Sequence, residues 1–85
     1  MIYNGGNDME NTTRLQGIGI VEGIPARELK VGDVTIWNNG GEEKILSIET
    51  SKSGKTMKCK VEYTWMGELK TAERKMTTSR IVVVK

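Results

Sequence analysis

The clearest pattern in the chain is a strict alternation of apolar and polar residues between Thr56 and Trp65. Apolar or aromatic residues occupy every second position, and the residues between them are lysine, glutamate or threonine. A period of two over this length is typical of an antiparallel strand with one buried face. The residues expected to share the core-facing side are Met57, Cys59, Val61, Tyr63 and Trp65.

Shorter apolar runs on both sides of this segment predict further strands, each bounded by turn residues. Residues 38–41 (NNGG) give the strongest hairpin signal, because asparagine and glycine readily adopt the positive φ angles of tight turns. Residues 51–55 and 66–68 predict two more turns. The strands expected between these turns comprise residues 15–21, 34–37, 44–50, 69–76 and 81–84.

Two segments between the strands have the pattern of short helical turns. Pro25 presets φ for the first position of one turn, and Leu29 and Val31 are expected to anchor it in the core. Gly32 is expected to end this turn with a positive φ. Residues 77–80 suit a single 3₁₀ turn before the last strand.

Composition supports an all-β fold. Isoleucine, valine and threonine number 24, whereas alanine and leucine together number six. Branching at Cβ suits a pleated strand and is restricted in a helix. The 85 residues suffice for one domain, which we place at residues 14–85, after a polar leader at residues 1–13 that we expect to be disordered. Short, evenly spaced strands predict a small barrel of five to six antiparallel strands.

The turn at residues 26–33, the hairpin after it and the loop containing Gly54 and Lys55 resemble a known family. Over residues 24–84 the chain is similar to the N-terminal barrel of translation elongation factor P, an SH3-like barrel of the KOW type. The resemblance implies an ordered turn before the first strand, a 3₁₀ turn before the last, and a projecting loop. It also makes Lys55 a candidate contact residue at the loop tip.

The sequence lacks the residue combinations that catalysis or cofactor binding requires. Histidine, the commonest general base and metal ligand, is absent. Residues 54–56 (GKT) match the end of a P-loop, but Glu49 stands where its first glycine is needed, and a strand follows in place of a helix. Cys59 falls on the buried face of its strand, and Glu42 and Glu43 are expected in a solvated turn. We therefore expect no enzyme, no cofactor and no metal site.

Charge divides the chain into an acidic first part and a basic second part. Residues 1–49 contain eight acidic and four basic residues, whereas residues 50–85 contain three acidic and nine basic residues. If Lys70 and Arg74 lie across from the lysines of the alternating strand, one sheet face is basic and suits phosphate groups. The alternative is an ordinary solvated face that keeps strand edges from aggregating. With two tryptophans as interface anchors, the candidate partner-binding residues are Lys52, Lys55, Lys58, Lys60, Lys70, Arg74, Trp37 and Trp65.

Two functions follow from these candidates, and both are binding functions. The first is contact with nucleic acid or a ribonucleoprotein through the basic face and the lysine-bearing loop tip. The second is that of a small phage or mobile-element protein that binds and inhibits or modulates a host protein. Because the chain shows no signal peptide and no apolar run of the roughly 20 residues that cross a membrane, we expect it in the cytoplasm without membrane contact.

Overall fold

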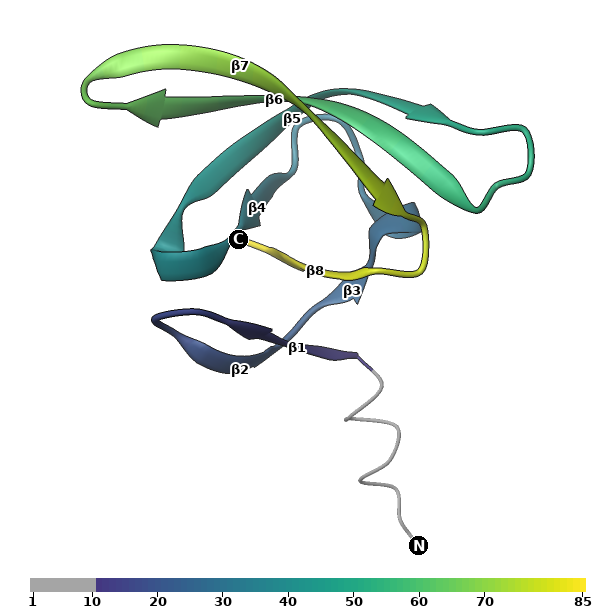
Figure 1. Cartoon of the computed structure of the whole chain (residues 1–85), viewed down its shortest axis with the longest axis horizontal. Coiled ribbons are helices and arrows are strands. Elements are labelled where there is room, and N and C mark those ends of the chain that lie inside the picture. The colour runs from purple at the N-terminus through teal and green to yellow at the C-terminus, as the bar shows by residue number, and fades with distance from the viewer. Residues whose placement is uncertain (1–10) are drawn as a thin grey trace, which may run out of the picture.

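The computed structural model of the chain describes residues 11–85, and this part is all-β. Its eight strands form a six-stranded and a two-stranded antiparallel sheet, accompanied by two 3₁₀ helices, η1 (Ala26–Glu28) and η2 (Asn38–Gly40) (Figure 1). The strands are β1 (Thr12–Leu15), β2 (Gly19–Glu22), β3 (Ile24–Pro25), β4 (Val34–Ile36), β5 (Glu42–Thr50), β6 (Thr56–Trp65), β7 (Glu68–Thr77) and β8 (Ile81–Val84). The larger sheet has the order β3-β8-β4-β5-β6-β7, and β1 pairs with β2. The described segments include no helix of the length and apolarity needed to cross a membrane.

Strand β6 has the bounds that its alternation predicts, and β4, β5, β7 and β8 agree with their predicted ranges to within two residues. Three of the five β6 residues expected on the core-facing side are buried, since Met57, Cys59 and Val61 are at most 3% exposed. The prediction of an all-β fold with these strands is therefore confirmed.

The burial of β6 ends before the strand does. Strand β5 pairs with β6 only as far as Glu62, so beyond this point β7 is the one strand of residues 11–85 that pairs with β6. Tyr63 is half-buried here, and Trp65 is exposed although it lies on the core side by alternation. We call this two-stranded end of the hairpin, residues 63–70, the β6–β7 tip (Figure 1).

The single strand predicted for residues 15–21 is wrong. The chain instead reverses between β1 and β2, because Gly17 (φ 82°) and Gly19 (φ 113°) adopt the positive φ angles of a turn. The predicted disordered leader lies outside the described residues up to residue 10, but Thr12 and Thr13, which it included, belong to β1.

The β1–β2 hairpin is held against η2 by its turn. The amide of Gln16 donates to Asn38 Oδ1 at 2.8 Å, and the amide of Asn39 donates to the carbonyl of Gln16 at 2.5 Å. This packing joins the small sheet to the β4–β5 connection, 22 residues further along the chain.

The turn before β4 is partly as predicted. Leu29 is buried and Gly32 has a φ of 97°, but Pro25 lies just before η1 in an extended conformation. Val31 is 63% exposed, so its predicted role as a core anchor is wrong. The turn is fixed through its backbone instead, since the amide of Gly32 donates to the carbonyl of Ile45 at 2.8 Å.

The 3₁₀ turn predicted for residues 77–80 is a four-residue turn with one hydrogen bond, from the amide of Arg80 to the carbonyl of Thr77 at 3.2 Å. Both 3₁₀ helices of the described chain lie elsewhere, at η1 and η2. The turn is also attached to η1, because the amide of Arg27 donates to the carbonyl of Thr78 at 3.0 Å.

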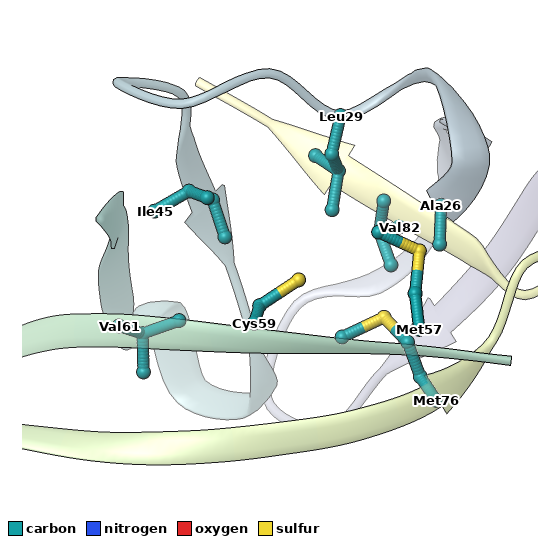
Figure 2. Close-up of a cluster of buried hydrophobic side chains, with 8 residues drawn as sticks. All are labelled: Ala26, Leu29, Ile45, Met57, Cys59, Val61, Met76 and Val82. Carbon is teal, nitrogen blue, oxygen red and sulfur yellow. The ribbon is translucent and has the colours of Figure 1, made fainter. Parts of the chain in front are cut away.

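The core lies between η1, β8 and the inner side of β5, β6 and β7 (Figure 2). The chain contains no phenylalanine, and sulfur-containing side chains supply adaptable filling in its place. The buried core residues are Ala26, Leu29, Ile45, Met57, Cys59, Val61, Met76 and Val82.

Candidate functional site

The pairing of β6 with β7 divides the predicted partner-binding residues between the two faces of the sheet. Arg74 pairs with the buried Cys59, and residues paired across antiparallel strands project from the same face. Arg74 therefore lies on the core side, as does Lys70 four residues earlier on β7. Lys58 and Lys60 alternate with Cys59 and lie on the outer face. The single basic face that would combine these four residues does not form.

The outer face of the sheet carries charges of both signs. Lys58 Nζ lies 3.8 Å from a carboxylate oxygen of Glu49, and Lys60 pairs with Glu73 across the strands. Lys75, which pairs with Lys58, adds one more positive charge. This mixture matches the ordinary solvated face that the sequence left open as the alternative.

Lys52 and Lys55 lie in the loop between β5 and β6, at the end of the sheet opposite the β6–β7 tip (Figure 1). Both side chains are exposed. Two hydrogen bonds attach the loop to the end of β7. Thr78 Oγ1 donates to the carbonyl of Gly54 at 2.7 Å, and the amide of Thr78 donates to the carbonyl of Lys55 at 2.9 Å. The two lysines therefore lie in a loop that is anchored by hydrogen bonds, apart from the other candidate partner-binding residues.

The core-side face carries aromatic and basic residues in a series from the β6–β7 tip to the turn before β8. Tyr63 pairs with Lys70, and Arg74 follows on the same face of β7 four residues further on. Arg74 and Trp37 line the same cavity, and the guanidinium of Arg80 lies over the ring of Trp37. We call this set the aromatic–arginine strip: Trp65, Tyr63, Lys70, Arg74, Trp37 and Arg80.

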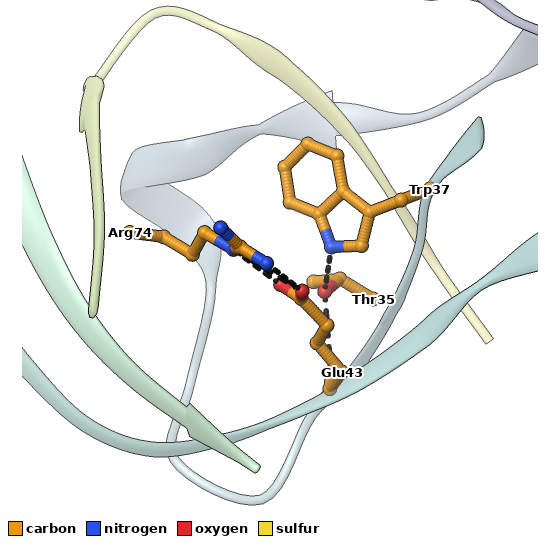
Figure 3. Close-up of polar contacts among 4 residues, drawn as sticks. All are labelled: Thr35, Trp37, Glu43 and Arg74. Carbon is orange, nitrogen blue, oxygen red and sulfur yellow. Dashed lines mark hydrogen bonds and ion pairs between the residues drawn. The ribbon is translucent and has the colours of Figure 1, made fainter. Parts of the chain in front are cut away.

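A chain of hydrogen bonds fixes the inner end of the strip (Figure 3). Trp37 Nε1 donates to Thr35 Oγ1 at 2.8 Å, and Thr35 Oγ1 donates to the carbonyl of Glu43 at 3.2 Å. Arg74 Nε donates to both carboxylate oxygens of Glu43, at 3.0 and 3.1 Å, and Arg74 Nη2 also donates to Glu43 Oε2. The indole and the guanidinium are therefore both positioned by Glu43, one through its backbone and one through its carboxylate.

Glu43 is 8% exposed, so the expectation that it lies in a solvated turn is wrong. It begins the inner side of β5, opposite the fully buried Thr35. A carboxylate at such a position needs a charged partner, and Arg74 supplies it. The hydrogen bond to Glu43 is the main cause that raises the pKa of Arg74 above its ordinary value.

A surface cavity of about 280 Å³ opens beside this network. The Arg80 guanidinium carbon lies 5.1 Å from the centroid of the Trp37 ring, within the range of a cation–π contact. We call it the Trp37 cavity, and its lining residues are Trp37, Glu43, Arg74, Lys75, Met76 and Arg80.

The β6–β7 tip exposes three large apolar side chains. Trp65 is 61% exposed, Met66 86% and Leu69 68%. The two-residue turn that carries them has positive φ at both positions, 51° at Met66 and 80° at Gly67, the conformation that matches the strand twist of a tight hairpin. These side chains therefore project from a defined hairpin and not from an irregular loop.

Metal binding and thiol reactivity are two further chemistries that concern the described residues. Residues 11–85 contain no group of histidine, cysteine or carboxylate side chains that could hold a metal ion. Cys59 is fully buried, and burial raises the pKa of its thiol, which makes it a poor nucleophile.

The sequence contained an unused signal for part of this site. A two-residue turn at Met66 and Gly67 fixes the hairpin register, and that register places Lys70 opposite Tyr63 and Arg74 opposite Cys59. Reading it would have assigned both basic residues to the core side. No local pattern predicts the positions of Arg80 and Glu43, because their contact residues, Trp37 and Arg74, are distant from them in the chain.

Comparison with known proteins gives no further constraint, since no protein-family model, curated protein or solved structure shows significant similarity to the chain.

Proposed function

We propose that the protein is a non-enzymatic binding module that docks on a partner protein through the β6–β7 tip. The observation that carries this proposal is the exposure of Trp65, Met66 and Leu69 on one hairpin end. Trp65 projects from the core side of this end, and Leu69, which pairs with Thr64, projects from the outer side. Exposed apolar side chains gathered at one place mark interaction sites on soluble proteins, and tryptophan and arginine dominate the energetics of protein interfaces. Modulation or inhibition of that partner is the expected consequence of docking.

The scaffold that presents the tip is, in this proposal, an SH3-like barrel. The two outer strands of the six-stranded sheet are β3 and β7. The hydrogen bond from Arg27, just after β3, to Thr78, just after β7, supports closure of the sheet at one end. Such closure protects strand edges and gives the tip a rigid base.

A tag-based capture experiment tests the docking proposal with matched variants. Leu69→Glu places a charge in the exposed apolar group, whereas Thr71→Glu adds the same charge to the same strand, two residues further on. Wild type and the Thr71→Glu variant are expected to retain the same partner protein, and the Leu69→Glu variant is expected to lose it. Equal retention by all three proteins would remove the tip from the interface.

Nucleic-acid binding, the first function expected from the sequence, is here the second candidate, and the loop between β5 and β6 favours it. Lys52 and Lys55 are exposed there, and no carboxylate of the described chain forms an ion pair with either. A mobility-shift assay with duplex DNA and structured RNA tests this candidate. Binding that weakens steeply as salt is raised would support it, because phosphate contacts release counterions.

A further inference from the structure

We propose that the Trp37 cavity is an oxyanion site that takes one carboxylate group of an acidic peptide segment. The ligand would sit between the guanidinium groups of Arg74 and Arg80, against the wall formed by Trp37. The site is defined by contacts within the chain, and it rests on the proposed function only in that a docked partner would supply the carboxylate.

Arg74 has N–H donors available for a second anion besides Glu43. A guanidinium has five N–H donors in a planar fork, and Glu43 occupies Nε and part of Nη2. Nη1 has no hydrogen-bond partner within residues 11–85, and the side chain is 44% exposed. Glu43 therefore holds the guanidinium in place at the cavity while leaving donors available.

Arg80 supplies the uncompensated charge. No carboxylate of the described residues forms an ion pair with it, and its only charge-related contact there is the ring of Trp37. This contact holds the guanidinium beside the cavity, and the side-chain N–H donors of Arg80 have no hydrogen-bond partner within residues 11–85. Because Glu43 is neutralised by Arg74, the cavity keeps the positive charge of Arg80.

The size and charge of the cavity favour a single carboxylate. Its volume of about 280 Å³ lies just below the range of sites for drug-sized ligands, which suits one side chain or one chain end. Glu43, Arg74 and Arg80 together carry one net positive charge, and a phosphate monoester of about −1.5 to −2 charges exceeds it. A carboxylate carries one charge, and its two oxygens match the arginine fork.

Titration of the ¹⁵N-labelled full chain, followed by two-dimensional NMR, tests the proposal. The probes are acetyl-Gly-Glu-Gly-amide, its glutamine counterpart, acetyl-Gly-Gly-Gly with a free carboxyl end, and inorganic phosphate. We expect both carboxylate peptides to shift the Trp37 indole N–H signal, with a Kd on the order of 1 mM, and the glutamine peptide to leave it unchanged. The tighter of the two carboxylate peptides identifies the source as a side chain or a chain end.

Variants remote from and within the cavity complete the test. Arg80→Gln is expected to weaken binding of the tighter peptide about tenfold, and Arg80→Lys, which keeps the charge and loses the fork, to have an intermediate effect. Lys55→Gln makes the same charge change at the distant loop and should alter Kd less than about twofold. An unchanged spectrum outside the cavity shows that each variant is folded.

Equal shifts from the glutamate and glutamine peptides, unchanged binding by the Arg80→Gln variant, or tighter binding of phosphate would each overturn the proposal. These outcomes are separable from the docking test, because the titration needs no partner and the Leu69→Glu variant should bind the peptides as wild type does.

Discussion

Arg74 on β7 and Glu43 on β5 form a bidentate ion pair across 31 residues of sequence. In a flat sheet, Glu43 would lie one position beyond the pair Lys44–Glu62, beside Tyr63. Arg74 would then be four residues away along β7, a distance of about 13 Å. The pair forms because the sheet curls and brings the start of β5 to the inner side of β7.

This pair predicts a measurable coupling energy. Arg74→Met leaves the Glu43 carboxylate almost buried without a partner and should lower the free energy of unfolding by about 2–3 kcal/mol. Glu43→Gln should also destabilise the protein, and the double variant should lose clearly less than the sum. Urea unfolding of the four proteins of this double-mutant cycle gives the coupling directly. A coupling below about 0.5 kcal/mol would show that the pair does not stabilise the fold.

Val61 is 1% exposed and lies at the centre of β6. Val61→Asp buries an unpaired charge, which costs several kcal/mol, comparable to the whole stability of a small domain, about 5–15 kcal/mol. We expect this variant to be unfolded by circular dichroism. Thr64→Asp, on the exposed outer side of the same strand, is the control and should melt near the wild-type temperature. An unchanged melting temperature for Val61→Asp would mean that the register of β6 is reversed.

The buried thiol of Cys59 predicts a loss of stability at alkaline pH. Burial raises its pKa in the folded chain, so above about pH 9 the unfolded chain binds fewer protons than the folded one. The free energy of unfolding should therefore fall as pH rises, by at most about 1.4 kcal/mol per pH unit from this group. The same measurement on Cys59→Ala controls for lysine and tyrosine titration, and its slope should be shallower. Identical slopes would assign the effect to those other groups.

Gly17 is predicted to be essential for the docking of the β1–β2 hairpin on η2. Its φ is 82°, and a Cβ there would clash with the Asn39 side chain. Gly19 also has a positive φ, but a Cβ there meets no atom within 4 Å. Gly17→Ala should therefore cost more stability than the roughly 1 kcal/mol expected for Gly19→Ala. Faster amide exchange confined to β1 and β2 would accompany this loss, and equal costs at both positions would contradict the predicted clash.

Reversal of the four lysines at residues 52, 55, 58 and 60 to glutamate separates the two candidate functions. All four side chains are exposed, and the one ion pair lost, between Lys58 and Glu49, is worth at most about 1 kcal/mol. The fold should therefore survive, as circular dichroism will show. Capture of a protein partner through the β6–β7 tip should persist, whereas any nucleic-acid binding should be abolished. Loss of the protein partner would instead place the interface on the lysines.

The sequence by itself determined the strands and most of the turns of this protein, because both depend on neighbouring residues. Period-two alternation set the bounds and the buried face of β6, and glycines with positive φ set the turns. The strand predicted for residues 15–21 is the exception, since Gly17 and Gly19 form a hairpin turn there.

Tertiary structure decided which charged residues meet. Lys58 and Arg74 are both basic and sixteen positions apart, yet pairing with β6 places them on opposite faces of one sheet. Glu43 has the local sequence of a solvated turn, and only the curl of the sheet buries it against Arg74. Strand alternation is a property of a few consecutive residues, whereas sheet curvature and the choice of ion-pair partner depend on the packing of strands that are distant in the chain.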